Sequence, residues 1–467
     1  MIIGSGGREH AMAWKIKQSP LCRKLWVAPG NAGTADMAQN VNIGAEDFDA
    51  IGQFCLTHQV DLIVVGPEGP LVHGIRDYFE GNPNLKNILM VGPGKSGARL
   101  EGSKDFSKQF MLRNNIPTAK AATFTADQLQ DALAYLQQCQ PPIVLKADGL
   151  AAGKGVVIST NAEEAGQVMR EMLEDKKFGE ASSKVLVEEF LDGIELSVFV
   201  LTDGQHYAIL PEAKDYKRIG ENDTGPNTGG MGAVSPVNFA DHDFMKKVEN
   251  RIIKPTIQGL SQENIPFIGF IFIGLMNVKG DPFVIEYNVR MGDPETQAVL
   301  PRIDCDFIDL LSKAAKGELT THTVPAKKEI ATTVVMVAGG YPGDYDKGKV
   351  IKGLDNEKKS LIFHAGTSTK VKHLPKELTV NSLQLLDVLN LSPLAPWHYL
   401  TYGEDFYFDL SPLTELGWKP KYSNDEMFFE AYDYFVEHFE EFSRANEGSA
   451  HRKKVKQKVL WLLKQFS

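Results

Sequence analysis

The chain has 467 residues, of which 43% are hydrophobic and 24% are charged, and its formal net charge is −10. This composition is typical of a soluble globular protein with about three domains, and the acidic balance argues against general binding to nucleic acids or to membranes. Four widely spaced cysteines without a CxxC pair, and no basic-then-apolar start, argue against a disulfide framework, structural zinc and a signal peptide; we expect a cytoplasmic protein.

The first hundred residues alternate short apolar strands with helix-like segments. Strands are predicted in "MIIG", "KLWVAPGN", "DLIVVGPEGP" and "NILMVGPG", and helices in "REHAMAWKIKQ" and "DFDAIGQFCLTHQ". This order predicts a doubly wound parallel sheet with ligand loops at the carboxyl ends of its strands. The first loop, "GSGGREH", matches a dinucleotide motif only in part, because Glu9 stands at the third glycine position. Phosphate binding at this helix start and a plain tight turn both remain open.

The stretch "KADGLAAGKGVVIS", residues 146–159, resembles a P-loop at first sight. Three residues separate Gly149 from Gly153, whereas a P-loop has four, and Lys154 is followed by Gly155 instead of Ser or Thr. The flanking "PPIVLKA" and "GVVIS" are typical of strands. We therefore predict a hairpin that carries Lys146 and Lys154, either at an ATP site or as an ordinary turn. Helices are predicted in "SKDFSKQFMLRNN" and "NAEEAGQVMREMLED", and a strand in "KVLVEEFLDG".

Residues 191–320 are predicted to form an antiparallel sheet with helices, in which "IPFIGFIFIGLMNV" is a buried strand pair. The glycine-rich stretch 212–236 is predicted to be a loop around a small polar or anionic ligand, with an ordinary surface loop as the alternative. Residues 330–370 are expected to begin a small β-rich unit.

The stretch "FVIEYNVRMGDPETQ" places Glu286, Asn288 and Arg290 at a spacing of two, on one face of a strand. A carboxylate beside an amide oxygen suits Mg²⁺, and the alternative is a polar face toward solvent. Asp293 and Glu295 are expected to cap the following helix or loop.

Residues 1–370 resemble the glycinamide ribonucleotide synthetases, also called phosphoribosylamine–glycine ligases, which are ATP-grasp enzymes of purine biosynthesis. The motifs that carry the resemblance are "GSGGREHAMAWK", "APGNAGT", "VVGPEGPLV", "KADGLAAGKGVV", "EEFLDG", "KDYKRIGENDTGPNTGGMGA", "GFIFIGLM", "VIEYNVRMGDPETQ" and "VVMVAGGYPGDY". The resemblance implies an α/β and α+β protein: an ATP-grasp fold after a doubly wound domain, then a truncated β-rich C-terminal domain and a mostly helical appendage. The implied limits are 1–103 for the sugar-phosphate domain, 104–320 for ATP-grasp with a hairpin subdomain at about 120–190, 321–370 for the truncated domain, and 371–467 for the tail.

The resemblance also implies the site residues. For ATP these are Lys104, Lys146, Gly153, Glu188, Glu189, Phe190, Leu191 and Glu195, with the strand from Val187 to Leu191 presenting its backbone to adenine and Glu195 holding the ribose. Glu286 and Asn288 would ligate Mg²⁺, or Mn²⁺. Arg290 and Asp215 would orient glycine. The phosphoribosylamine residues would be Gly4, Ser5, Gly6, Gly7, Arg8, Gly30, Asn31, Gly66, Pro67, Glu68, Asp223, Thr224 and Asn227.

The implied reaction joins glycine to phosphoribosylamine and converts ATP to ADP and phosphate. The glycine carboxylate attacks the γ-phosphate, and the sugar amine then traps the acyl phosphate. A carboxylate is already a nucleophile at neutral pH, so we expect lysines and magnesium to position groups and neutralise charge. The implied partners are these small molecules, with no nucleic acid, no membrane and an open oligomeric state.

After "IFHAGTSTK" the family's glycine-rich "GGRVL" strand pair is missing. The following "LSPLAPWHYLTYGEDFYFDLSPLTELGWKPKYSNDEMFFEAYDYF" resembles the carboxyl-terminal part of NAD-dependent sugar epimerases, without their dinucleotide loop or catalytic pair. We expect a tail without catalytic residues. Two alternatives stay open: a fusion that binds ATP with impaired or no ligase activity, and a sugar-nucleotide-binding module.

Overall fold

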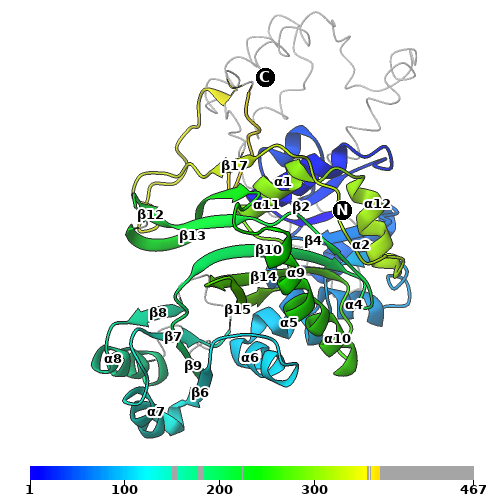
Figure 1. Ribbon diagram of the computed structural model, residues 1–467. Coiled ribbons are helices and arrows are strands. Elements are labelled where there is room, and N and C mark those ends of the chain that lie inside the picture. Colours follow the sequence, from blue (N-terminus) through cyan, green and yellow to red (C-terminus); the bar gives the residue numbers. More distant parts are fainter. Residues whose placement is uncertain (150–154, 176–183, 223, 355–356, 358, 369–467) are drawn as a thin grey trace, which may run out of the picture. The chain divides into compact units, whose positions relative to one another are not determined.

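The computed structural model describes residues 1–149, 155–175, 184–222, 224–354, 357 and 359–368 (Figure 1). All of them belong to Met1–Thr369, the first of the two units into which the chain divides. The predicted tail, Gly153, Lys154 and Asp223 lie outside the described residues. Within the described part, no helix combines the length and the apolar character needed to cross a membrane.

The first sheet is parallel throughout, as the alternation of strands and helices predicted, and its strand order is β3-β2-β1-β4-β5. Both faces are covered: Ile2 packs in one hydrophobic cluster and Ile3 in another, and neither side chain is exposed. The strands are β1 (Ile2–Gly4), β2 (Trp26–Pro29), β3 (Gln39–Asn40), β4 (Leu62–Val65) and β5 (Leu89–Val91). The helices are α1 (Gly7–Lys17), α2 (Phe48–Thr57), α3 (Glu68–His73), α4 (Ile75–Gly81) and α5 (Lys95–Gly102), with a 3₁₀ turn at Thr34–Asp36.

A second sheet, of order β6-β9-β7-β8, contains the predicted glycine hairpin. Its strands are β6 (Ala121–Thr125), β7 (Ile143–Ala147), β8 (Val156–Ser159) and β9 (Lys184–Glu189). Strands β7 and β8 pair antiparallel, which confirms the strand–loop–strand prediction and excludes a P-loop. Helix α6 (Lys104–Arg113) precedes the sheet, and Figure 1 shows α7 (Leu129–Leu136) and α8 (Ala162–Leu173) beside it, with a 3₁₀ turn at Ala126–Gln128.

The third sheet has the order β15-β14-β10-β11-β16 and is antiparallel except for the pair β11 and β16. Its strands are β10 (Ile194–Thr202), β11 (Tyr207–Ile209), β14 (Gly269–Val278), β15 (Asp281–Asn288) and β16 (His322–Thr323). Its helices are α9 (His242–Val248), α10 (Lys254–Gln262), α11 (Glu295–Val299) and α12 (Phe307–Lys316), with a π-helical turn at Glu249–Ile253 and a 3₁₀ turn at Leu300–Arg302.

The prediction of a strand pair in "IPFIGFIFIGLMNV" was wrong, because β14 is one strand between β10 and β15. Gly274 does not turn the chain. It faces Glu286 at a register shift, and a Cβ there would lie 3.3 Å from Glu286 Cγ. A glycine inside a strand can thus mark a close contact in place of a turn.

The stretch 212–236 is also not a loop. It forms the antiparallel strands β12 (Lys214–Gly220) and β13 (Thr224–Ser235), and β17 (Ala331–Val334) completes a sheet of order β12-β13-β17. The glycines permit close strand contact: a Cβ on Gly232 would lie 2.7 Å from the carbonyl oxygen of Thr333. Among the described residues from 330 to 368, β17 is the one strand that fits the predicted β-rich unit.

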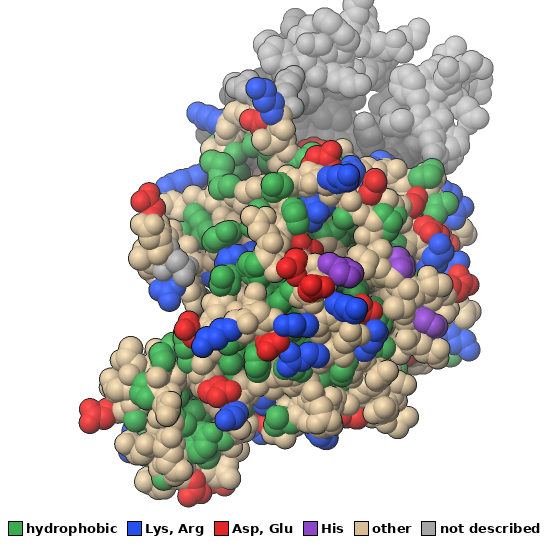
Figure 2. All heavy atoms as spheres, viewed as in Figure 1, with side chains coloured by type: hydrophobic (Ala, Val, Ile, Leu, Met, Phe, Trp, Pro, Cys, Tyr) green, Lys and Arg blue, Asp and Glu red, His purple; other side chains and the backbone are tan. Residues whose placement is uncertain are grey.

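Basic and acidic side chains are interspersed on the face shown in Figure 2. The buried charged side chains that lie where the sheets contact one another are more informative about a functional site.

Candidate active site

Two lysines and one glutamate form a buried cluster. Lys146 comes from β7, Glu188 from β9 and Lys108 from α6. The Lys146 Nζ lies 2.6 Å from Glu188 Oε2, and the Lys108 Nζ lies 2.7 Å from Glu188 Oε1. Burial alone would raise the pKa of Glu188, but Lys146 and Lys108 outweigh it and lower that pKa. Glu188 is therefore an ionised bridge between two amines. Lys108 is not among the site residues predicted from the sequence.

The base of the glycine hairpin is attached to the start of α6. The Lys104 Nζ donates a hydrogen bond to the carbonyl oxygen of Gly149 at 2.9 Å. Asp148 accepts one from the backbone N–H of Asp105 and another from the Ser103 hydroxyl, both at 3.2 Å. A carboxylate at a helix N-terminus is favourable, so these contacts hold Lys104 beside the hairpin.

Strand β9 ends at Glu189, so the predicted strand from Val187 to Leu191 is too long. Val187 and Glu188 pair with β6 on one side and β7 on the other, which occupies their backbone groups. Phe190 and Leu191 lie beyond the strand, where the backbone leaves this ladder. Glu189 is exposed, and its carboxylate accepts from the Lys120 N–H at 2.9 Å.

Glu286 lies among cationic side chains from several elements. Burial would raise its pKa, but Lys217, Lys146, Lys104 and Arg290 together lower it. Nearby on β15, Asn288 is buried; its Oδ1 accepts from Arg290 at 3.1 Å, and its Nδ2 has no hydrogen-bond partner among the described residues. An ionised carboxylate and an amide oxygen are hard donors, and this pair fits Mg²⁺ shared with phosphates.

Arg290 follows the end of β15 and links it to the first domain. Its Nη2 lies 2.8 Å from Glu101 Oε1, and its Nε lies 3.6 Å from Glu68 Oε2. Burial raises the pKa of Glu101, although Arg290 opposes this. Arg290 and Glu68 are predicted site residues, whereas Glu101 is not, because the helical pattern of α5 does not distinguish it.

A second acidic group surrounds Lys217. The Lys217 Nζ lies 3.0 Å from Glu195 Oε2 and 3.8 Å from Asp215 Oδ2. Burial raises the pKa of Asp215, and burial together with Asp215 raises the pKa of Glu295 to about 7. Glu295 begins α11, where a cap was expected, but its side chain is buried and accepts from the Ser197 hydroxyl at 3.4 Å.

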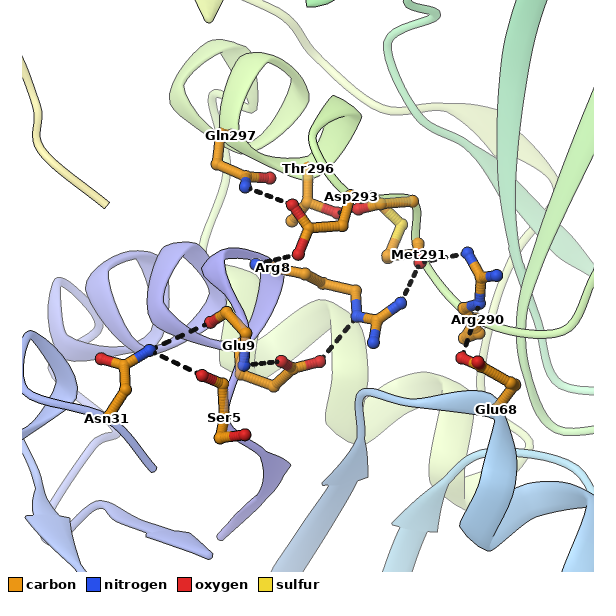
Figure 3. A network of polar contacts seen from close by, with 12 residues as sticks. Ser5, Arg8, Glu9, Asn31, Glu68, Arg290, Met291, Asp293, Thr296 and Gln297 are labelled. Atoms are coloured by element: carbon orange, nitrogen blue, oxygen red, sulfur yellow. Dashed lines mark hydrogen bonds and ion pairs between the residues drawn. The ribbon is translucent and has the colours of Figure 1, made fainter. Parts of the chain in front are cut away.

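The first glycine loop is closed by carboxylates, as Figure 3 shows. Glu9 accepts from the Gly6 N–H and from Arg8 Nε, both at 2.6 Å. Its side chain fills the space beside Gly4 and Gly66, where added Cβ atoms would lie 2.6 and 2.0 Å from it. Glu9 therefore explains both these glycines and the failed dinucleotide motif.

Asp293 does not fit the prediction that it caps the following helix or loop. It accepts from the backbone N–H of Arg8, at the start of α1, at 3.2 Å, and from the Gln297 side chain at 2.6 Å (Figure 3). Arg8 in turn donates to the carbonyl oxygen of Met291 at 3.0 Å. The loop 291–293 is thereby joined to the first glycine loop.

The segment 363–367 also contacts this loop. Asn31 Nδ2 donates to the carbonyl oxygens of Ser5 at 2.9 Å and of His364 at 2.8 Å. The His364 N–H donates to His10 Nδ1 at 2.8 Å, so this nitrogen must be unprotonated, and burial with His364 lowers the pKa of His10 to about 4. This contact does not follow from the sequence motifs, because the resemblance that they carry ends at "IFHAGTSTK".

Other predicted residues lie at the margins. Gly30 N–H donates to the Gly4 carbonyl at 3.1 Å, which places these two loops together, and Pro67 precedes α3. Thr224 and Asn227 are exposed on the hairpin of β12 and β13: Thr224 donates to the Glu221 carbonyl, and Asn227 pairs with Arg218 across the strands.

Family models match the chain in three parts. They are described as the N domain, the ATP-grasp (A) domain and the C domain of phosphoribosylglycinamide synthetase, and they match residues 1–101, 102–296 and 331–389. Together with the sheets described above, these matches define an ATP-grasp enzyme. The C-domain match continues beyond Lys370, where the sequence analysis ended the resemblance.

Relatives named phosphoribosylamine–glycine ligase are similar to this chain over most of their length. The phosphoribosylamine–glycine ligase of Escherichia coli O6:H1 (strain CFT073) is 47% identical over 372 residues, which cover 79% of this chain and 85% of the relative. The Vibrio cholerae ligase is 46% identical over 375 residues, with coverage of 79% and 86%. The chain belongs to the phosphoribosylamine–glycine ligase family.

Solved structures agree with this family assignment. The crystal structure of the Thermotoga maritima phosphoribosylamine–glycine ligase has a TM-score of 0.68 and 35% identity, and covers 79% of this chain and 87% of that chain. N5-carboxyaminoimidazole synthetase from Staphylococcus aureus, at 16% identity and a TM-score of 0.52, shares the fold alone. The C-domain match includes residues 371–389, so the predicted epimerase resemblance is wrong for them. For residues 390–467 the epimerase resemblance lies outside the C-domain match and stays a prediction.

Proposed function

We infer that the protein is an ATP-dependent ligase that joins glycine to 5-phosphoribosylamine and gives glycinamide ribonucleotide, ADP and phosphate in purine biosynthesis. The family membership supports the reaction. The observation that supports it is the set of four cations, Lys104, Lys146, Lys217 and Arg290, that together lower the pKa of the Glu286 carboxyl against the effect of burial. Such a cluster suits a triphosphate and a metal ion, because phosphoryl transfer depends on positioning and on neutralising charge.

We place the ATP phosphates at Lys104 and Lys146, with the base beyond β9 at Phe190 and Leu191 and the ribose at Glu195. The contact between Lys104 and Gly149 supports this, because it puts an amine at the base of the glycine hairpin. ATP-grasp enzymes use ATP with Mg²⁺, and Glu286 and Asn288 would hold the ion, or Mn²⁺. When bound, the ion would neutralise phosphate charge.

We place glycine between Arg290 and Asp215. Arg290 can attract a carboxylate, although Glu101 and Glu68 already share its guanidinium. Asp215 and Glu295 are buried carboxyl groups that suit an ammonium group. The glycine carboxylate would attack the γ-phosphorus with loss of ADP, and the sugar amine would attack the resulting acyl carbon with loss of phosphate.

We place phosphoribosylamine at the loops that contain Gly4 to Arg8, Gly30 and Asn31, and Gly66 to Glu68. The N–H groups of Gly6 and Arg8 already donate to Glu9 and Asp293, so the phosphate would use other donors of these loops. Asp223, Thr224 and Asn227 stay predictions. The segment 363–367 contacts the same loops, so the described residues cover this side of the proposed sugar-phosphate site.

The test is phosphate release by the full chain with ATP, Mg²⁺, glycine and phosphoribosylamine, with each component omitted in turn. We expect release that requires all four. ATP binding without release would favour the alternative of a fusion with impaired activity. Failure to bind ATP would contradict the proposed function.

A further inference from the structure

Lys108 is a buried lysine whose donors are all used within the protein. It lies four residues after Lys104 on α6, and its side chain is 2% exposed. Its Nζ contacts Glu188 Oε1 at 2.7 Å, the Thr118 hydroxyl at 2.6 Å and the Ala119 carbonyl at 3.1 Å. An ammonium group has three N–H donors, and three acceptors surround this one. Lys108 therefore has no donor left for a nucleotide.

Lys146 differs in this respect. The described residues offer its Nζ the Glu188 carboxylate at 2.6 Å and the Ile285 carbonyl at 3.3 Å. One donor is left for a ligand. The two lysines thus share one carboxylate, but only Lys146 can also contact a phosphate.

The charge of the cluster depends on Lys108. Burying a lysine is costly: burial lowers the pKa of Lys108, and Glu188 counteracts this. Lys108, Glu188 and Lys146 together carry a charge of about +1 when all are ionised. Without Lys108, Glu188 would neutralise Lys146, and one buried carboxylate oxygen would lose its partner.

We propose that Lys108 is a positioning residue for the nucleotide: it takes up one oxygen of Glu188 and offsets its charge, so that Lys146 stays oriented and net positive toward the phosphates. This role rests on the proposed function, because it requires ATP phosphates at Lys146. Lys108 acts through Glu188 and Lys146 and does not touch the nucleotide.

The experiment measures binding of MgATP and of adenosine to the full chain and to Lys108→Met, which keeps much of the side-chain volume but removes the charge. We expect MgATP affinity to fall on the order of tenfold or more, and adenosine affinity to change by less than about threefold. Equal losses for both ligands would indicate a general structural defect and overturn the proposal. Lys15→Met is the matched control, because Lys15 is also buried and donates to the Ile303 carbonyl, away from this cluster.

A separate experiment tests whether Lys108 acts by offsetting the charge of Glu188. Lys108→Met combined with Glu188→Gln restores the wild-type cluster charge, so we expect this double variant to recover most of the lost MgATP affinity. Lys108→Gln provides a second arm if Lys108→Met fails to fold: it keeps a hydrogen-bond donor toward Glu188 but removes the charge, so we expect the same selective loss of MgATP affinity. Additive losses in the double variant, or wild-type MgATP affinity in Lys108→Gln, would overturn the proposal.

Measurements on the wild type distinguish a failure of the proposed ligase function from a failure of the proposed role of Lys108. If the wild type binds MgATP but releases no phosphate, the ligase function fails while the role of Lys108 can still be measured. A wild type that does not bind MgATP would overturn both.

Discussion

Glu286 is an ionised carboxylate that four cationic side chains stabilise. Lys217, Lys146, Lys104 and Arg290 all stabilise its ionised form, and a phosphate group would in turn be stabilised by them. The same residues would repel one another if the carboxylate were removed. This cluster therefore supports the proposed site for ATP phosphates and a metal ion.

We expect Glu286→Ala and Lys146→Ala each to abolish turnover while the protein remains folded. Loss of one charged group at a phosphoryl-transfer site costs on the order of 10²-fold or more. Phosphate release and a circular dichroism melt would measure both properties. Asp281→Ala is a control on the same strand, since Asp281 pairs with Lys247 and Arg251 at the surface. Near-normal activity in either site variant would contradict the assignment.

Glu295 gives a prediction about pH. Its pKa is raised to about 7, so the folded state holds a proton that the unfolded chain releases near pH 4.5. The stabilisation from this proton is complete below about pH 4.5 and is lost as the pH rises to about 7. Glu295→Gln cannot ionise, so we expect it to be more stable than wild type at pH 8, by about 1–3 kcal/mol, and nearly equal at pH 4.5. Thermal melts at both pH values measure this; an equal difference at both would refute it.

At the scale of elements, the first glycine loop and α1 form one unit with the loop after β15. Glu9 and Asp293 accept the first N–H groups of α1, which are the groups that a helix leaves without partners. Loops far apart in the chain are thereby joined at one helix start. We therefore expect a substitution in the first glycine loop to affect ligand binding by the first domain.

We expect Gly6→Val to weaken phosphoribosylamine binding and to leave ATP affinity nearly unchanged. A Cβ on Gly6 would lie 2.9 Å from Glu9 Oε2 and 3.1 Å from Asp293 Oδ2, so the larger valine must displace these carboxylates. Titration calorimetry with each ligand measures the effect. Gly44→Val is the control, because a Cβ there has no described atom within 4 Å. Loss of ATP binding with sugar-phosphate binding retained would reverse the domain roles.

At the scale of the whole molecule, the described ATP-site residues all precede residue 296, whereas the C-domain match continues to residue 389. We expect truncation after Lys370 and truncation after Leu389 both to leave ATP binding unchanged. Calorimetry on each purified variant measures this. If the protein that ends at Lys370 folds but no longer binds ATP, residues 371–389 belong to the site. If only the protein that ends at Leu389 retains turnover, residues 371–389 support the C domain.

The sequence by itself determined the parallel-sheet domain, the glycine hairpin and the charged residue types available to the site. Apolar runs bounded by glycine located β1, β4 and the hairpin of β7 and β8, because such patterns depend on local backbone geometry and burial. Motif spacing excluded a P-loop. The resemblance of several motifs to the glycinamide ribonucleotide synthetases implied an ATP-grasp ligase. Glycine content misled at β13 and β14, where it reflects close contacts between strands that local sequence cannot show.

Only the tertiary structure decided which charges meet. A buried charge needs a partner, and packing supplies that partner from any part of the chain. Lys108 thus meets Glu188, Arg290 meets Glu101, and Asn31 contacts His364 across 333 residues of sequence. None of these pairs follows from periodicity, because helices and strands place residues on faces but do not determine what packs against them.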